Sequence, residues 1–176
     1  LGGDHDYFPK LRSIVVHPAP FRSQVTRIGL TGQPEVSWEW RAGESWGLGT
    51  VVLAWSSVLE GARNPVDARN VVFHEFAHQL DAMEPHSRGA PLLRERGLYR
   101  LWAEHMGDAY HRLLDDLDHH RKTILDDYAA TDAAEFFAVV TETFFERPNA
   151  LRVRYPEVYD LLARFYAQDP AQRTRR

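Results

Sequence analysis

Residues 71–81 read Val71-Val72-Phe73-His74-Glu75-Phe76-Ala77-His78-Gln79-Leu80-Asp81, and this stretch decides how the rest of the chain is interpreted. On a helix, His74 and His78 stand one turn apart and project from the same face. Their imidazole nitrogens can therefore meet one zinc ion at about 2.0–2.1 Å. Glu75 is rotated from His74 by about 100°, so it can hold a water at the metal and take its proton. The pattern predicts a zinc site with Glu75 as the catalytic base.

The surroundings of this stretch favour a metal site over a chance match, which would leave two exposed histidines beside a solvated glutamate. The neighbouring residues are apolar, and buried imidazoles need a partner. Helix signals also frame the stretch. Asn64 is expected to cap the helix, with Pro65 at its first position, Asp67 in its first turn and Pro85 at its end.

A third ligand has to come from elsewhere, because catalytic zinc usually has three protein ligands. The chain has no cysteine, so the candidates are carboxylates and histidines. Asp81 shares the histidine stripe, and we expect it to orient a ligand imidazole, although direct ligation stays open. Glu135 and Glu142 lie on one face of a later helix, and either could reach the metal. Alternatively, Glu135 belongs to a capping box with Asp132, and Glu142 is a solvated or hydrogen-bonded helix carboxylate.

The order of the expected elements predicts an α+β fold in one domain, residues 1–176. Residues 1 to about 64 have the glycines, prolines and short apolar runs of strands and loops. Strands are expected at Leu11–Val16, Thr26–Leu30, Val36–Trp40 and Thr50–Trp55. A mostly helical part follows, with further helices from about Leu98 to His119, from Asp132 to before Pro148, and from Pro156 to Ala167. The sequence thus predicts a small sheet followed by helices.

The composition argues against nucleic-acid and membrane partners. The net charge is −4, and the only basic cluster is a short C-terminal tail. No apolar run approaches the roughly 20 residues that span a bilayer. The absence of cysteine fits a reducing compartment, so we expect a cytoplasmic protein.

Beyond these motifs, the chain resembles the Mlc titration factor A family of bacterial zinc peptidases from Tyr7 to Pro170. The resemblance rests on four stretches: Gly43-Glu44-Ser45-Trp46, Val51-Val52-Leu53-Ala54-Trp55, residues 74–81 and Ala134-Glu135-Phe136-Phe137-Ala138-Val139. It implies a zincin-like metallopeptidase domain with a gluzincin-like site. Family members are typically longer at the N-terminus, so we expect this chain to lack a leading helical segment.

The resemblance also implies roles for individual residues. One Zn²⁺ per chain would be held by His74, His78 and Glu135, and the site is similar to that of the anthrax lethal factor catalytic domain. Both families place a tyrosine seven residues before the third ligand. That position is Tyr128 here, and it would stabilise the oxyanion; the alternative is an ordinary half-buried core tyrosine.

Three functions follow as hypotheses. The first is hydrolysis of a peptide or protein substrate, with the strand Thr50–Trp55 as the sheet edge that pairs with it. Gly47 and Gly49 would let the substrate approach closely. The second is binding of a transcriptional repressor of the Mlc type, with proteolysis secondary. The third is hydrolysis of another carbonyl substrate. The sequence leaves open whether cleavage is internal or from the N-terminus.

Overall fold

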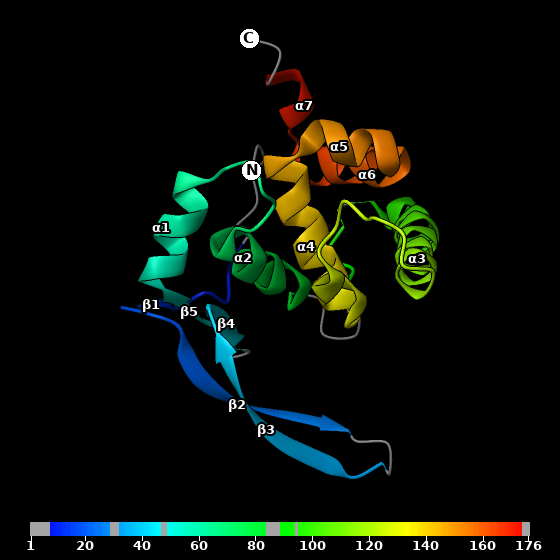
Figure 1. Cartoon of the computed structure of the whole chain (residues 1–176). Helices are drawn as coiled ribbons and strands as arrows, with labels where there is room; N and C mark the ends of the chain where they lie inside the picture. The colour runs from blue at the N-terminus through cyan, green and yellow to red at the C-terminus, as the bar shows by residue number, and fades with distance from the viewer. Residues whose placement is uncertain (1–7, 29–31, 47–48, 84–88, 94, 174–176) are drawn as a thin grey trace.

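The computed structural model describes residues 8–28, 32–46, 49–83, 89–93 and 95–173 (Figure 1). Strands come first and helices follow, as the sequence predicted. The elements are β1 (Ser13–His17), β2 (Phe21–Ile28), β3 (Pro34–Arg41), β4 (Gly43–Trp46), β5 (Thr50–Ala54), α1 (Trp55–Arg63), α2 (Val71–Asp81), α3 (Arg96–Asp118), the 3₁₀ helix η1 (Asp127–Ala130), α4 (Ala133–Glu146), α5 (Pro148–Arg154), α6 (Pro156–Tyr166) and α7 (Pro170–Arg173).

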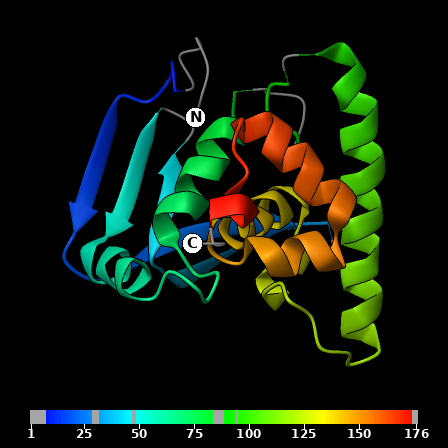
Figure 2. The same cartoon turned by 90° about the horizontal axis from the view of Figure 1, so that it is seen from above.

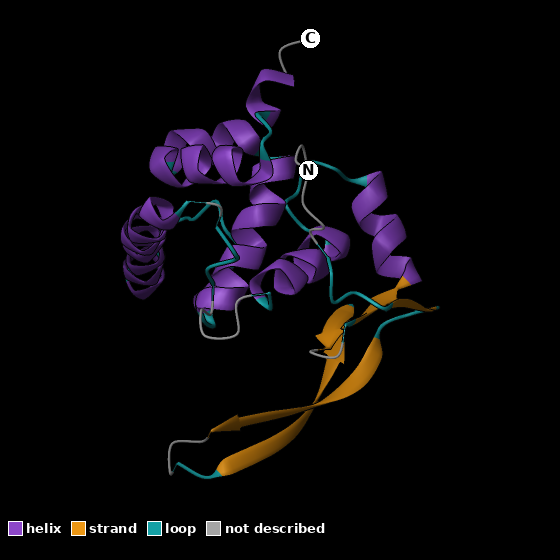
Figure 3. Cartoon of the chain, turned by 180° about the vertical axis from the view of Figure 1, so that it is seen from behind, coloured by secondary structure: helices purple, strands orange, loops and turns teal. Residues whose placement is uncertain are grey.

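The strands form a small mixed sheet and a separate hairpin. In the sheet the order is β1-β5-β4, with β1 parallel and β4 antiparallel to β5. Strands β2 and β3 pair only with each other, and their hairpin extends away from the helices (Figures 1 and 3). The predicted α+β class is therefore confirmed.

The structure corrects the prediction that Thr50–Trp55 is a sheet edge. Strand β5 lies between β1 and β4, so both of its edges are already paired. In the described sheet, β1 and β4 take the two edge positions. Gly49 also has a different reason to be glycine: its φ is +84°, and a Cβ there would lie 1.8 Å from the Lys10 carbonyl oxygen. Glycine is therefore needed at position 49 for a close contact with the backbone of the same chain. Gly47 lies outside the described residues.

Helix α2 begins later than its sequence signals indicated. Asn64 does not cap it; its side chain donates to Asp67, and Ala68 then takes a left-handed φ of 61° that interrupts a helix. The cap is Asn70, whose side-chain oxygen accepts from the backbone N–H groups of Val72 and Phe73. The prediction chose the wrong asparagine, because both precede residues that are compatible with a first turn. The expected end at Pro85 lies outside the described residues, and α2 itself ends at Asp81.

Helix α1 was not predicted, since residues 1–64 were interpreted as strand and loop. It follows β5 directly, and its N-cap position is Ala54, which offers no capping side chain. A start signal was therefore missing from the sequence. Helix α5 was also missed, because Pro148 both ends the expected helix and opens a new one at its first position.

Helix α4 is the centre of the helical part (Figure 2). All of its residues from Phe136 to Phe144 are buried. Trp102 of α3 and Phe165 of α6 both meet the ring of Phe137 edge-on, at centroid distances of 5.6 and 6.2 Å. These contacts hold α4 in place against α3 and α6. The first turn of α4 is thereby held against α2, which carries the two histidines.

Candidate metal centre

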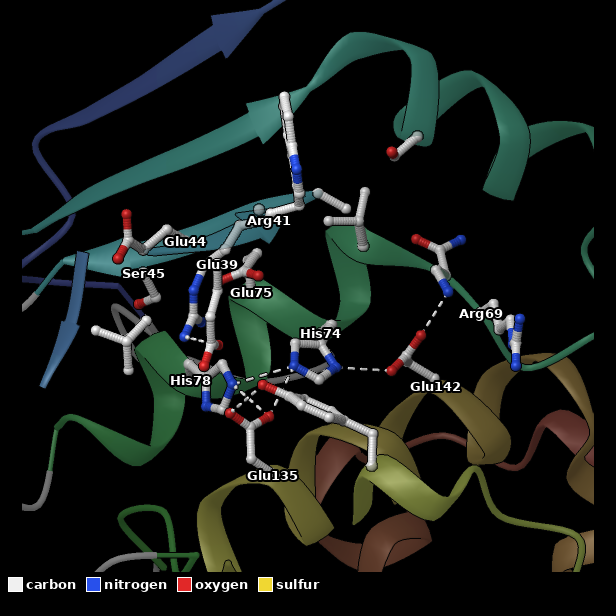
Figure 4. Close-up of a pocket in the computed structure, with 18 of the residues that line it drawn as sticks. Glu39, Arg41, Glu44, Ser45, Arg69, His74, Glu75, His78, Glu135 and Glu142 are labelled. Carbon is white, nitrogen blue, oxygen red and sulfur yellow. Dashed lines mark hydrogen bonds and ion pairs between the residues drawn. The ribbon is translucent and has the colours of Figure 1, made fainter. Parts of the chain in front are cut away.

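The two histidines of α2 meet one carboxylate from the first turn of α4. Nε2 of His74 lies 3.0 Å and Nε2 of His78 lies 3.2 Å from Oε2 of Glu135, and the two Nε2 atoms are 3.2 Å apart (Figure 4). A tetrahedral ion with ligand bonds of about 2.0–2.1 Å needs ligand atoms about 3.3 Å apart. The three atoms thus form one face of a tetrahedron that fits zinc, and the donor set of two imidazoles and a carboxylate suits it.

The local fold explains how Glu135 reaches this position. Asp132 caps α4 by accepting from the N–H groups of Ala134 and Glu135, as the sequence indicated. The glutamate does not complete a capping box, because its side chain turns to the histidines instead. Its other oxygen, Oε1, accepts from the Tyr128 hydroxyl at 3.1 Å.

The carboxylates of the cluster favour a positive charge between them, either on a histidine or on a bound cation. Burial would lower the pKa of His74, but its contacts with Glu135 and Glu142 outweigh burial and raise that pKa to about 10. Burial would raise the pKa of Glu135, but the hydrogen bonds with His74 and His78 hold it well below its ordinary value. A cation bound between these groups would satisfy the same demand.

Glu75 points away from the ligand face and into the cavity beside it (Figure 4). It is only 5% exposed, and Gly43 of β4 lies directly against it. Burial, opposed in part by the two histidines, raises the pKa of Glu75 to about 7. A carboxylate with that pKa binds and releases a proton near neutral pH.

Tyr128 lies on the other side of the cluster, on the 3₁₀ helix η1. Asp126 caps η1 by accepting from the Tyr128 backbone N–H, and the phenol ring stands 6.0 Å from the His74 ring. Burial, reinforced by the negative charge of Glu135, raises the pKa of Tyr128 to about 12. The hydroxyl therefore keeps its proton and remains a hydrogen-bond donor.

The sequence did not foresee which carboxylate orients a histidine. Asp81 was expected in that role, but its Oδ1 is buried without a hydrogen-bond partner among the described residues. Glu142 makes the ring contact instead, with Oε1 2.8 Å from Nδ1 of His74. It is 6% exposed, so it is the hydrogen-bonded helix carboxylate of the sequence alternatives.

Glu142 also connects the cluster to the cap of α2. Its second oxygen accepts from the backbone N–H of Asn70, the residue that caps the helix carrying both histidines. One turn further along α4, Glu146 accepts from the side-chain amide of Asn70 at 2.9 Å. Only the seven-residue spacing of Glu135 and Glu142 signalled this arrangement in the sequence.

Strand β4 covers the cluster on the side facing the sheet. The Gln79 side chain donates to Ser45 Oγ at 2.5 Å and ties α2 to this strand. One cavity of about 820 Å³ also reaches the hairpin residues Glu39 and Arg41, and its lining includes Gly43, Ser45, His74, Glu75, His78, Tyr128, Glu135 and Glu142. The cavity thus presents a metal-binding face, a buried carboxylate, a phenol and a strand edge to whatever enters it.

These features define the class first: a cluster that could hold a metal, beside a buried acid–base group, as in metallopeptidases. A family comparison then identifies the particular group. Residues 1–167 match the family described as glucose-regulated metallo-peptidase M90, and the chain belongs to this family. The fold and the family together confirm a metallopeptidase-type domain.

Individual relatives agree with the family. An uncharacterized protein of Synechocystis is 39% identical over 93% of this chain and 60% of its own length. Mlc titration factor A of Klebsiella pneumoniae is 34% identical, and that of Salmonella agona 31%, each over 97% of this chain and 64% of the relative. The resemblance to the Mlc titration factor A family is confirmed. The chain spans about three fifths of the length of these relatives.

The structure also bears on membrane association. Among the described residues, no helix is both long and apolar enough to cross a bilayer. The expectations of a cytoplasmic location and of no nucleic-acid partner stay predictions.

Proposed function

We propose that this chain is a zinc peptidase in which His74, His78 and Glu135 hold the metal. The observation that carries the proposal is the triangle of three ligand atoms, 3.0–3.2 Å apart, with the buried carboxylate of Glu75 next to it. Zinc, when bound, supplies Lewis acidity that polarises a carbonyl and lowers the pKa of water to about 7.

Glu75 is the general base in this proposal. Its carboxylate takes a proton from the attacking water and returns it to the leaving amine, which needs a pKa near the working pH. Burial has raised the pKa of Glu75 to about 7, which meets that requirement. Gly43 leaves room for the side chain to stay in place, since a Cβ there would lie 2.6 Å from Glu75 Oε1.

Tyr128 is the proposed donor to the oxyanion of the tetrahedral intermediate. A pKa of about 12 keeps its hydroxyl protonated, and 40% exposure of the residue leaves it open to the cavity. Once released from Glu135 Oε1, which accepts its proton in this structure, the hydroxyl would stabilise negative charge that develops only during the reaction.

The substrate backbone is proposed to pair with β4. This strand is one of the two edges of the described sheet, and its residues Gly43 to Ser45 line the cavity, whereas no residue of β1 does. An extended peptide that adds to a sheet edge gains main-chain hydrogen bonds. β4 therefore takes the role that the sequence had suggested for β5.

Glu75→Gln tests this function. The substitution keeps size and hydrogen bonding but cannot accept the proton, so peptide hydrolysis should fall by about 10²–10⁴. Zinc content should stay near one per chain, whereas Glu135→Ala should lose most of the metal. Full hydrolysis by metal-loaded Glu75→Gln would exclude the proposed mechanism, and full zinc content in Glu135→Ala would exclude the proposed third ligand.

A second candidate rests on the relatives named Mlc titration factor A. We propose, as an alternative, that this chain binds a transcriptional repressor of the Mlc type and that proteolysis is secondary. Glu75→Gln separates the two functions, because it should abolish hydrolysis while leaving repressor binding intact. Absence of repressor binding by the wild-type chain in a pull-down with purified repressor would exclude this alternative.

A further inference from the structure

The hairpin brings an arginine into the cavity that the catalytic proposal does not use. Side chains of β3 alternate, so that Glu39 and Arg41 face inward while Trp38 and Trp40 are 60% and 71% exposed. Both inward residues line the cavity beside the histidine–glutamate cluster (Figure 4), and the exposed Trp40 between them also contributes to its lining. A charged residue that could have faced solvent is instead directed at the site.

Several N–H donors of Arg41 have no close acceptor among the described residues. Its nearest ionic partner is Oε2 of Glu39, 3.5 Å from the guanidinium, which is longer than a good hydrogen bond. The buried Nε has no hydrogen-bond partner among the described residues. A guanidinium carries five N–H donors in a planar fork that matches a carboxylate, so most of its capacity is uncommitted.

The charge of Arg41 acts close to the reacting groups. Burial is the main cause that raises the pKa values of Glu75 and Tyr128, and Arg41 is among the charges that oppose the rise in both. The guanidinium therefore lies within electrostatic reach of the proposed base and of the proposed oxyanion donor. A substrate held at these groups would pass beside it.

The chain direction indicates which part of a peptide would meet Arg41. Antiparallel pairing is the more stable arrangement for a strand added to β4. Because Arg41 precedes Gly43, it then lies toward the C-terminal side of the substrate. Gly43 stands against Glu75, and Arg41 precedes Gly43 by two positions across a bend at Ala42. Arg41 therefore lies beyond the N-terminal end of β4, near the second residue after the bond at Glu75.

We propose that Arg41 is a specificity-determining residue that binds a carboxylate on the second residue after the cleaved bond. The inference rests on the proposed peptidase function. The carboxylate is either the free C-terminus of a substrate that ends there or the side chain of an acidic residue. It would replace the long contact of Arg41 with Glu39, whose other oxygen lies 3.5 Å from the Ser37 hydroxyl.

Two pairs of peptides distinguish the sources of the carboxylate. One pair ends at the second residue after the cleaved bond, as an acid or as an amide. The other pair continues beyond it and carries Glu or Gln at that position. Binding is measured by calorimetry on zinc-loaded Glu75→Gln, and kcat/KM on the wild type. We expect a carboxylate of at least one source to improve both by about 10- to 100-fold, the range for a charge-assisted hydrogen bond.

Arg41→Gln, placed in each background, should remove this preference. Arg22→Gln is the matched control, because Arg22 carries the same charge on the same hairpin but lies over the outward Trp38 ring. It should keep the preference. Zinc content and melting temperature of both variants show whether they are folded, and Arg41→Lys, which keeps the charge without the fork, should retain part of the preference.

The inference is overturned if neither carboxylate improves binding, or if Arg41→Gln keeps the full preference. A preference for a free amine would also overturn it and would assign the position to Glu39. These outcomes differ from failure of the proposed function, which is absence of hydrolysis by the zinc-loaded wild type while the binding preference is still measurable.

Discussion

Glu142 offers a sharp test of how the chain would hold the proposed zinc ion. Its carboxylate bonds to Nδ1 of His74 and to the backbone N–H of Asn70, and only 6% of it is exposed. Glu142→Ala removes the acceptor that fixes the His74 ring. Loss of such a supporting contact typically weakens metal binding by about 10–100-fold, and we expect that range for zinc.

The same variant should also be less stable without metal. The Asn70 N–H loses its partner in a buried position, at a cost of about 1–3 kcal/mol. For a chain of this size each kcal/mol lowers the melting temperature by about 2–4 °C. The metal-free, chelator-treated variant should therefore melt roughly 2–12 °C lower than the wild type.

Glu146→Ala provides the control. Glu146 bonds to the side chain of the same Asn70 but has no contact with His74 in the described structure. It should lower the melting temperature and leave zinc affinity near the wild-type value. Affinity is measured by competition with a chromophoric chelator. Equal losses of affinity in Glu142→Ala and Glu146→Ala would refute the reasoning, because the effect would then arise from the helix cap and not from the ring.

Three further outcomes follow from the structure. Tyr128→Phe should lower kcat by about 10²–10³, the range for one oxyanion donor, with zinc content unchanged; an unaltered kcat would return Tyr128 to the core-residue alternative. Gly43→Ala would place a Cβ 2.6 Å from Glu75 Cγ. Peptide hydrolysis should therefore fall at least about tenfold while zinc is retained. Full activity would show that β4 can move away from Glu75 and would contradict this prediction. Asp116, 1% exposed, has its pKa lowered chiefly by the hydrogen bond from Arg154. Because its pKa is lower in the folded than in the unfolded state, it stabilises the fold above about pH 4, and this contribution is lost as the pH falls through the folded value. The melting deficit of Asp116→Asn should therefore be largest at neutral pH and shrink in acid, and a deficit independent of pH would contradict this.

Local sequence patterns correctly predicted that the two histidine rings lie together. The spacing of His74 and His78 needs only a helix to bring the rings together, and a helix is a local structure. Asp132 as a cap likewise acts within one turn of its own chain. The family resemblance, not the spacing, singled out Glu135 as the third ligand, because the meeting of α2 and α4 depends on packing between distant segments.

Elements without local signals were missed. Helix α1 has no capping side chain. At Ala68 the backbone takes a left-handed conformation, which interrupts the helix whose first turn was expected there. The edge of the sheet was misplaced for a related reason. Strand order depends on which distant segments pair, and β1 pairs with β5 across 37 residues of sequence. Nothing in the apolar run of β5 shows whether its edges are covered.

Residues 39–45 form one wall of the cavity. They show why the proposed substrate specificity was harder to predict from the sequence than the histidine pair. Residues 39–45 pass from β3 into β4 and contribute the Arg41 side chain, the bare backbone of Gly43 and the Ser45 hydroxyl within one short segment. Each of these residue types is common on a protein surface, so none marks a site by itself. They form part of the site only because α2 packs against β4, where Gln79 donates to Ser45 and Glu75 lies against Gly43. Since this wall belongs to the hairpin and sheet while the proposed metal ligands belong to α2 and α4, substitutions at Arg41 should alter the proposed substrate preference without changing the residues proposed to bind zinc.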